Sequence, residues 1–232
     1  MNNYHPIRRS PISARGKSLV ERAGWQIAEA YSTLEAEAAA VRGSVGLADL
    51  SALGKVQIQG AALPALQAAF GSAPGQPGEV AAVEGGLLAC LTHDDWYLTA
   101  PVGGEAQALE RLQGALSAAG AFAHATDVTH AYAALLLAGP RSREVLPKLC
   151  GLDFHPAVFP NRAVRQSSVA RLRTILIRDN LAGGGLPAYQ LHVARSEADY
   201  LWGVLLDAAS EFGAQPVGAA ALAALQANAS AN

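Results

Sequence analysis

The sequence has little cysteine, little charge and no long apolar run, and each shortage excludes a class of protein. The two cysteines, Cys90 and Cys150, lie far apart, so they form neither a disulfide framework nor a metal-ligand pattern. No apolar stretch approaches the roughly 20 residues that span a bilayer, and the first residues hold no apolar core of a signal peptide. We therefore expect a soluble, cytoplasmic protein without a bound metal.

Charge is scarce and nearly balanced. The 232 residues include 17 basic and 19 acidic side chains, which gives a formal net charge of −2. A chain without a basic field cannot hold a phosphate backbone, so we expect no nucleic-acid partner. Hydrophobic residues make up 51% of the chain, which is enough for a proper core. The low charge density leaves apolar surface exposed, and that favours a partner subunit.

The apolar pattern mixes strands and helices without a regular alternation of the two, so we expect an α+β fold. Ser32, followed three residues later by Glu35, is expected to cap the first helix, and Ser196 is expected to cap a later one. Strands are expected at 55–59, 87–92, 96–102, 121–126, 133–138, 163–171, 174–178 and 189–194, and helices at 32–45, 61–70, 105–119, 140–149, 196–212 and 218–229.

The order of these elements repeats within the chain. A strand, a glycine and a helix occur twice, with Gly60 matching Gly139, and a strand followed by a helix occurs twice, with Tyr97 matching Tyr189. Each half therefore resembles a split βαβ unit. The expected divisions are an N-terminal extension and helix at 1–53, a first α+β half at 54–130 and a second at 131–232.

Motifs for nucleotide binding, zinc binding or a nucleophile elbow are absent from the sequence. None of the six histidines forms an HxH or HxxxH pair, so we interpret each as a surface or structural residue. Trp25 follows Gly24 in an irregular stretch and is the best candidate for an aromatic that faces a ligand, although a core position is the simpler interpretation.

The stretch 23–60 carries the strongest family signal. It resembles the N-terminal part of the glycine-cleavage T-protein, an aminomethyltransferase, through Gly24, Trp25, Arg42, Val45, Gly46, Leu47, Asp49, Ser51, Gly54, Lys55 and Val56. The second half, at 127–160 and 187–213, is more similar to the gamma subunit of heterotetrameric sarcosine oxidase. The resemblance implies two related α+β halves around a central cleft, and transfer of a one-carbon unit to tetrahydrofolate.

The chain departs from the T-protein pattern where that family places charged site residues. The family's paired aspartates fall on Ala89 and Cys90, its glutamate on Gln190 and its C-terminal arginine on Leu222. Neither a protonated thiol nor a carboxamide supplies the charge of a carboxylate. The family's further C-terminal barrel domain is not expected, because the chain ends at Asn232.

These losses favour a non-catalytic subunit that resembles sarcosine oxidase gamma. Its expected partners are flavin-containing amine oxidase or dehydrogenase subunits in a folate-linked, amine-demethylating complex of one-carbon metabolism. The alternative is a stand-alone tetrahydrofolate-dependent aminomethyltransferase or demethylase with altered residues. No catalytic residue is assigned; if tetrahydrofolate binds, the candidate contacts are Trp25, Arg178, Tyr189 and Gln190. A folate-binding protein that repairs iron–sulfur proteins is disfavoured, because neither cysteine lies in that family's Lys-Gly-Cys-Tyr-x-Gly-Gln-Glu motif.

Overall fold

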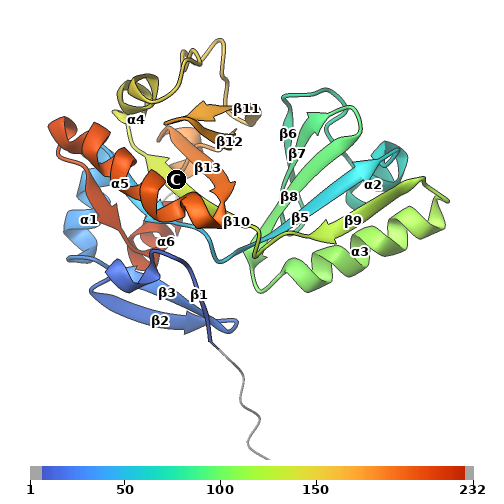
Figure 1. The fold of residues 1–232 in the computed structure, drawn as a ribbon, viewed down its shortest axis with the longest axis horizontal. Coiled ribbons are helices and arrows are strands. Elements are labelled where there is room, and N and C mark those ends of the chain that lie inside the picture. Colours follow the sequence, from blue (N-terminus) through green and yellow to red (C-terminus); the bar gives the residue numbers. More distant parts are fainter. Residues whose placement is uncertain (1–6, 228–232) are drawn as a thin grey trace, which may run out of the picture.

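The computed structural model describes residues 7–227, which form two lobes beside a small N-terminal sheet (Figure 1). The small sheet has the strand order β1-β3-β2, and its strands are β1 (Arg8–Arg9), β2 (Ser18–Arg22) and β3 (Trp25–Ala30). Within residues 7–227 no helix has both the length and the apolar character that crossing a membrane requires.

The first lobe is a five-stranded sheet with the order β6-β7-β8-β5-β9 and helices on one of its faces (Figure 1). Its elements are β5 (Leu53–Gly60), α2 (Leu63–Phe70), β6 (Val80–Val83), β7 (Gly86–Thr92), β8 (Asp95–Val102), α3 (Glu105–Ala118) and β9 (Ala123–Asp127). Leu88 and Leu98 of the sheet pack against Leu66 of α2 and Leu112 of α3. Because side chains alternate along a strand, every second residue points to the other face, towards the second lobe.

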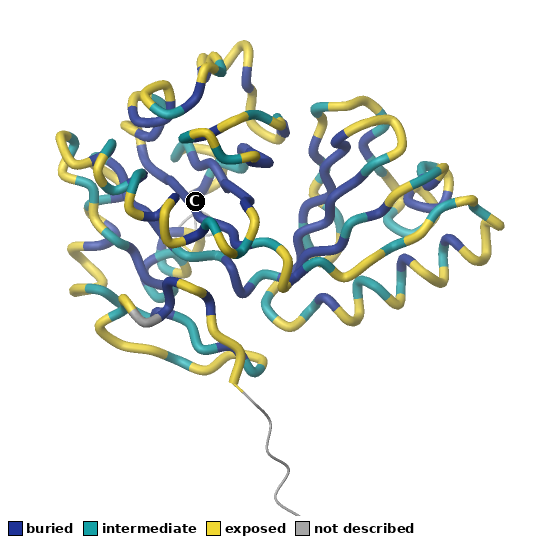
Figure 2. The backbone as a smooth tube through the Cα atoms, in the orientation of Figure 1, coloured by how far each residue is buried: buried dark blue, intermediate teal, exposed yellow. Residues whose placement is uncertain are grey.

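The second lobe is a six-stranded sheet with the order β11-β12-β13-β10-β4-β14 and helices on both faces. Its elements are α1 (Leu34–Gly43), β4 (Gly46–Asp49), β10 (Tyr132–Ala138), α4 (Ser142–Val145), β11 (Ala163–Val169), β12 (Leu172–Arg178), β13 (Ala188–Ala194), α5 (Ala198–Ala209), β14 (Gln215–Val217) and α6 (Ala219–Ala227). Val145 of α4 and Trp202 of α5 belong to the core on one face, and Val41 of α1 and Leu225 of α6 to the core on the other. Figure 2 shows buried stretches along the strands of both sheets.

The lobes meet along a surface that we call the interlobe face. Ala89 and Tyr97 of the first lobe share one buried apolar cluster with Ile175 and Ile177 of the second. The sheet edges are also joined, because the Val80 N–H donates to the Arg162 carbonyl at 3.0 Å and the Val164 N–H to the Gly78 carbonyl at 2.9 Å. The two lobes are therefore packed against each other rather than merely tethered by chain connections.

The structure confirms the α+β prediction and contains a counterpart of each predicted strand and helix. In the lobes, the strands β4, β6 and β14 were not predicted, because three or four residues are too few to show a period of two. The strands of the N-terminal sheet were not predicted either, and Trp25 lies in β3 rather than in an irregular stretch. The helix expected at 140–149 ends early and continues as a 3₁₀ turn, Leu146–Lys148. Pro147 explains this change, since proline has no N–H to donate to an α-helical hydrogen bond.

The predicted helix caps are wrong. Thr33, not Ser32, caps α1, because its Oγ1 accepts a hydrogen bond from the Ala36 N–H at 3.3 Å. Glu37 takes the part expected of Glu35 and accepts from the Ser32 N–H at 2.6 Å. No side chain caps α5, which follows a 3₁₀ turn, Arg195–Glu197, that contains Ser196.

The internal repeat appears in the strand order, since β6-β7-β8-β5-β9 of the first lobe corresponds to β11-β12-β13-β10-β4 of the second. Gly60 ends β5 with φ +106° and Gly139 follows β10 with φ +122°. A Cβ at Gly60 would lie 2.4 Å from the Phe122 carbonyl oxygen, and one at Gly139 2.4 Å from that of Ser44. The two positions therefore require glycine for the same two reasons, φ and close backbone contact.

The tyrosine match within the repeat is displaced by one residue. Trp96 pairs with Ile58, two residues before Gly60, and Tyr189 pairs with Leu137, two residues before Gly139. The counterpart of Tyr189 is therefore Trp96 rather than Tyr97. A displacement of one residue moves a side chain to the opposite face of a sheet, so the correction changes which residues of the two lobes are compared.

The division of the chain at residues 53 and 130 stays a prediction. β4 comes from the segment assigned to the N-terminal extension, yet it pairs with β10 in the sheet of the second lobe. The N-terminal segment therefore completes that lobe.

Candidate functional site

The resemblance implies a cleft between the two halves, which makes the interlobe face the candidate site. Four buried polar side chains reach it from two strands of the first lobe and one strand of the second: Lys55 of β5, Tyr97 of β8, and Gln190 and His192 of β13. The face opposite Gln190 and His192 on β13 carries apolar core residues such as Leu191. Strand alternation therefore separates a polar side, towards the first lobe, from an apolar side.

A chain of hydrogen bonds joins the lobes at the centre of this face. Tyr97 Oη lies 3.2 Å from His192 Nδ1, and His192 Nε2 lies 3.3 Å from Gln190 Oε1. Because the Gln190 carboxamide oxygen only accepts, Nε2 carries the imidazole proton, Nδ1 accepts and the Tyr97 hydroxyl donates. Both ring nitrogens are thereby engaged within the protein, so His192 has no free nitrogen for a ligand.

Electrostatics keep the imidazole neutral. Burial and, to a smaller extent, the nearby Lys55 ammonium together lower the pKa of His192 to about 3. Lys55 is itself fully buried, and its Nζ donates to the Ser51 carbonyl at 2.9 Å and the Leu53 carbonyl at 2.8 Å. Burial lowers the pKa of Lys55 to about 8. The centre of the face therefore holds a neutral ring beside one cation.

The positions of the family's paired aspartates hold no acid. Ala89 is fully buried and pairs with Tyr97 on the interlobe face. Cys90 points to the other side of the sheet, into the core beneath the helices, where its Sγ donates to the Thr92 carbonyl at 3.1 Å. Burial raises the pKa of the Cys90 thiol to about 11, so it stays protonated and is a poor nucleophile.

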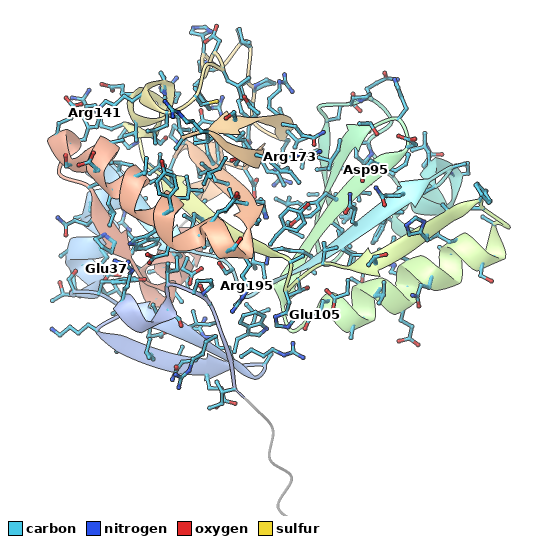
Figure 3. The ribbon with its side chains drawn as sticks, in the orientation of Figure 1. Glu37, Asp95, Glu105, Arg141, Arg173 and Arg195 are labelled. Atoms are coloured by element: carbon cyan, nitrogen blue, oxygen red, sulfur yellow. The ribbon has the colours of Figure 1, made fainter. Side chains whose placement is uncertain are left out.

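The rim of the interlobe face carries opposite charges. Asp95 of β8 and Arg173 of β12 face each other across the space between the lobes (Figure 3). Both carboxylate oxygens of Asp95 accept from Gln57 Nε2 at 3.1 Å. Burial raises the pKa of Asp95, and the hydrogen bond from Gln57 and the charge of Arg173 oppose that rise. The Asp95 carboxylate is therefore already hydrogen-bonded within the first lobe.

Two of the predicted folate contacts lie together, on the far side of the second sheet. Arg178 and Tyr189 are register partners, with the guanidinium carbon 5.7 Å from the tyrosine ring centre. Arg178 also donates to the Phe159 carbonyl, and Tyr189 meets Phe159 edge to face at 5.7 Å. Tyr189 is fully buried in the core beneath α5, so this pair faces away from the first lobe.

Trp25 lies apart from the other three predicted contacts. It is fully buried in β3, and its ring stacks on that of His130 at 5.1 Å and 14°. The Arg8 guanidinium lies 6.0 Å from the indole centre and donates to Glu105 Oε1 at 2.7 Å. Trp25 therefore belongs to the junction between the N-terminal sheet and the lobes, where Figure 3 places Glu105 and Arg195.

Of the four predicted contacts, only Gln190 reaches the interlobe face, and the binding role of all four stays a prediction. Reasoning from sequence missed Tyr97, His192 and Lys55 as residues of this face. A signal was available, because Gln190 and His192 are polar residues at a spacing of two in an apolar strand. Among the described residues, no group of three or more His, Cys, Asp or Glu side chains could hold a metal ion.

Comparison with known proteins decides the family. A family model described as the GCVT N-terminal domain matches residues 10–231. The chain belongs to this family. Its GCVT domain is 29% identical over 219 residues to an aminomethyltransferase of Acidobacterium capsulatum, covering 88% of the chain and 56% of the relative. It is 24% identical to sarcosine oxidase subunit alpha of Rhizobium meliloti, covering 97% of the chain and 26% of that protein. The chain thus spans about half or less of the length of these relatives.

Solved structures show the same GCVT fold. A chain of the heterotetrameric sarcosine oxidase from Corynebacterium sp. U-96 is 28% identical with a TM-score of 0.64, and the match covers 77% of this chain and 92% of that one. The glycine cleavage system aminomethyltransferase T from Bartonella henselae has a TM-score of 0.76 at 18% identity, covering 95% of this chain and 62% of that one. The predicted fold, two related α+β halves as in folate-binding aminomethyltransferases, is therefore confirmed.

Proposed function

We propose that this GCVT domain is a non-catalytic subunit, similar to sarcosine oxidase gamma, of a folate-linked amine-demethylating complex. The observation that carries the proposal is the closed interlobe face. Ala89 stands where the family has an aspartate, and Tyr97 and Gln190 both hydrogen-bond to His192. An interlobe face with no carboxylate at Ala89 or Gln190, and packed with apolar side chains around that network, does not suit a ligand that the family holds with carboxylates.

The extent of the similarity supports the subunit interpretation. The match to the sarcosine oxidase chain covers 92% of that chain, whereas the aminomethyltransferase of Acidobacterium capsulatum is covered over 56%. The partners in this proposal are flavin-containing amine oxidase or dehydrogenase subunits, which supply the redox chemistry. The subunit itself contributes assembly and stability within a hetero-oligomer.

Recovery of the native complex tests the proposal. The tagged full chain is expressed in its source organism, purified under gentle conditions and examined for co-purifying protein and for the visible absorbance of flavin. We expect a stoichiometric partner that carries flavin. Recovery of the chain alone, as a well-behaved monomer at native expression level, would contradict the subunit role.

The alternative is a stand-alone tetrahydrofolate-dependent aminomethyltransferase or demethylase. It is favoured by the 29% identity to a curated aminomethyltransferase. Titration calorimetry of the isolated chain with tetrahydrofolate separates the two functions, and we expect no saturable heat. If saturable binding is found, Gln190→Ala should weaken it, since Gln190 alone of the four predicted contacts lies on the interlobe face. Arg178→Gln and Trp25→Phe test two of the predicted contacts that lie away from that face.

A further inference from the structure

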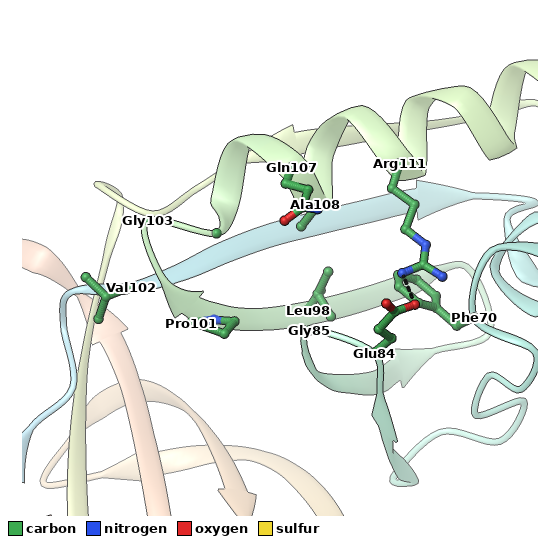
Figure 4. A pocket seen from close by; sticks show the side chains of 11 residues that line it. Phe70, Glu84, Gly85, Leu98, Pro101, Val102, Gly103, Gln107, Ala108 and Arg111 are labelled. Atoms are coloured by element: carbon green, nitrogen blue, oxygen red, sulfur yellow. Dashed lines mark hydrogen bonds and ion pairs between the residues drawn. The ribbon is translucent and has the colours of Figure 1, made fainter. Parts of the chain in front are cut away.

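A cavity unconnected with the interlobe face lies on the helical side of the first lobe. α2 has only eight residues and ends at Phe70, whereas α3 has fourteen, so the helices do not cover the sheet equally. The uncovered part is a cavity of about 350 Å³ beneath α3, next to the turn between β6 and β7 (Figure 4). This volume is within the range of small-molecule sites.

One cation dominates the cavity. Arg111 extends from α3, and its guanidinium carbon lies 4.8 Å from the centre of the Phe70 ring. Its Nη2 donates to the Ala69 carbonyl at 2.6 Å, which fixes the group in place. Its Nη1 donates to Glu84 Oε2 at 2.9 Å, and the Glu84 side chain is 82% exposed. An ion pair with so exposed a carboxylate contributes little stability, so another carboxylate can replace Glu84.

The remaining wall suits an apolar group beside that carboxylate. Leu98 and Pro101 of β8 and Ala108 of α3 line the cavity, and Phe70 closes one side of it. Gln107 also lines it, and Figure 4 shows its carboxamide directed from α3 into the space. The cavity thus presents an apolar floor, an aromatic side and one guanidinium held at the rim. The Arg111 guanidinium already lies over the Phe70 ring. A planar ligand ring beside that guanidinium would add a second cation–π contact of the same kind.

We propose that this cavity binds a small aromatic carboxylate. Its ring rests against Phe70, Leu98 and Ala108, and its carboxylate takes the place of Glu84 on Arg111. The site uses no residue of the interlobe face, so it stands whether or not the chain is a subunit of an oxidase complex.

Benzoate is the probe, and benzamide is its neutral match. Both are titrated into ¹⁵N-labelled full chain, and backbone amide shifts are followed together with the Arg111 side-chain signal. We expect shifts confined to Gly85, Gly103, Gln107 and their neighbours, with benzamide binding at least fivefold more weakly. The proposal is overturned if the highest benzoate concentration causes no amide shifts, or if the shifts lie elsewhere in the protein. Equal binding of benzoate and benzamide would also overturn it.

Two substitutions of opposite expected sign complete the test. Glu84→Gln removes the competing carboxylate and should tighten benzoate binding roughly two- to fivefold. Arg111→Gln removes the charged donor and should weaken binding about tenfold or more. Arg22→Gln, which removes a comparable exposed ion pair with Glu29, is the control and should leave binding unchanged. Since Glu84→Gln alters only an exposed side chain, it keeps the test decisive even if Arg111→Gln fails to fold.

Discussion

The two lobes share one strand order but use the two faces of their sheets differently. In both lobes, the face beneath the helices carries a large aromatic residue at the same position, Trp96 in the first and Tyr189 in the second. On the interlobe face the next position is Tyr97 in the first lobe and Gln190 in the second. The aromatic positions beneath the helices are therefore alike in kind, whereas the equivalent positions on the interlobe face differ.

The second lobe is also more completely covered. Helices α4 and α5 pack on one face of its sheet, and α1 and α6 on the other. In the first lobe α2 and α3 cover one face, and the second lobe covers the other. Since Ala89 and Tyr97 need Ile175 and Ile177 to stay buried, the first lobe depends on the second for its interlobe face. The comparison predicts one cooperative unit built from two similar halves.

The largest expected effect comes from truncating the equivalent aromatics. Trp96→Ala and Tyr189→Ala each remove a fully buried ring from a helix-covered core, so each should lower the free energy of unfolding by about 3–5 kcal/mol. Urea unfolding followed by circular dichroism measures the loss, and the two costs should be similar. Separate transitions for the two lobes in either variant would break the comparison, because shared interlobe packing requires them to unfold together.

The equivalent glycines come next. Gly60→Ala and Gly139→Ala should each cost about 3 kcal/mol, because a Cβ would enter the space of a carbonyl oxygen at a positive φ. Gly71→Ala is the matched control: φ is +73° there, but nothing lies within 4 Å of the added Cβ, so about 1 kcal/mol is expected. Thermal unfolding of the three variants gives the ranking. Equal costs at all three positions would show that backbone strain alone, and not the repeated close contact, matters.

These comparisons also show what the sequence could and could not predict. The alternation of apolar residues predicted the longer strands, and the resemblance to the T-protein family predicted the fold. Both predictions depend on local sequence patterns. The register between strands depends on distant residues, so Tyr97 was matched to Tyr189 when the counterpart is Trp96. A shift of one residue reverses the face, and that reversal separates core from candidate site.

The same limit explains why the predicted folate contacts do not all lie on one face. Arg178, Tyr189 and Gln190 are close in the sheet, yet strand alternation places Gln190 alone on the interlobe face. The sequence alone shows that Ala89 and Gln190 are not the acids of the T-protein pattern, because residue type is read directly from the sequence. It could not reveal that Tyr97 and His192 fill the face between them, because these residues lie 95 positions apart and meet only through packing.

Lowering the pH should reduce the free energy of unfolding through His192 of the interlobe face, but not through a histidine on the surface of the first lobe. His192 stays neutral in the folded chain down to about pH 3, whereas an unfolded histidine takes up a proton near pH 6.5. Between these values the unfolded state binds more protons, so stability falls as pH falls, by up to about 1.4 kcal/mol per pH unit, and is unaffected above that range. In His192→Gln this slope should be reduced, with a difference of about 2 kcal/mol at pH 5 relative to pH 7.

The matched control for that measurement is His124→Gln, which changes an exposed histidine of β9. Its unfolding free energy, measured in urea at several pH values between 5 and 7, should keep the slope of the unmodified chain. If both variants keep that slope, His192 is not the group that makes the chain sensitive to acid, and the interlobe face is not the buried, neutral centre described above.

The smallest expected effect on stability comes from removing the hydroxyl group of each of the two fully buried tyrosines, Tyr97 and Tyr189. Tyr97→Phe removes the donor to His192 Nδ1 and leaves that nitrogen buried without a partner, which should cost about 1–3 kcal/mol. The Tyr189 hydroxyl has no hydrogen-bond partner among the described residues, so Tyr189→Phe should change stability by less than about 0.5 kcal/mol. Urea unfolding at pH 7 measures both. A cost for Tyr97→Phe as small as that for Tyr189→Phe would mean that the Tyr97–His192 bond adds nothing to the apolar packing and backbone hydrogen bonds that join the lobes.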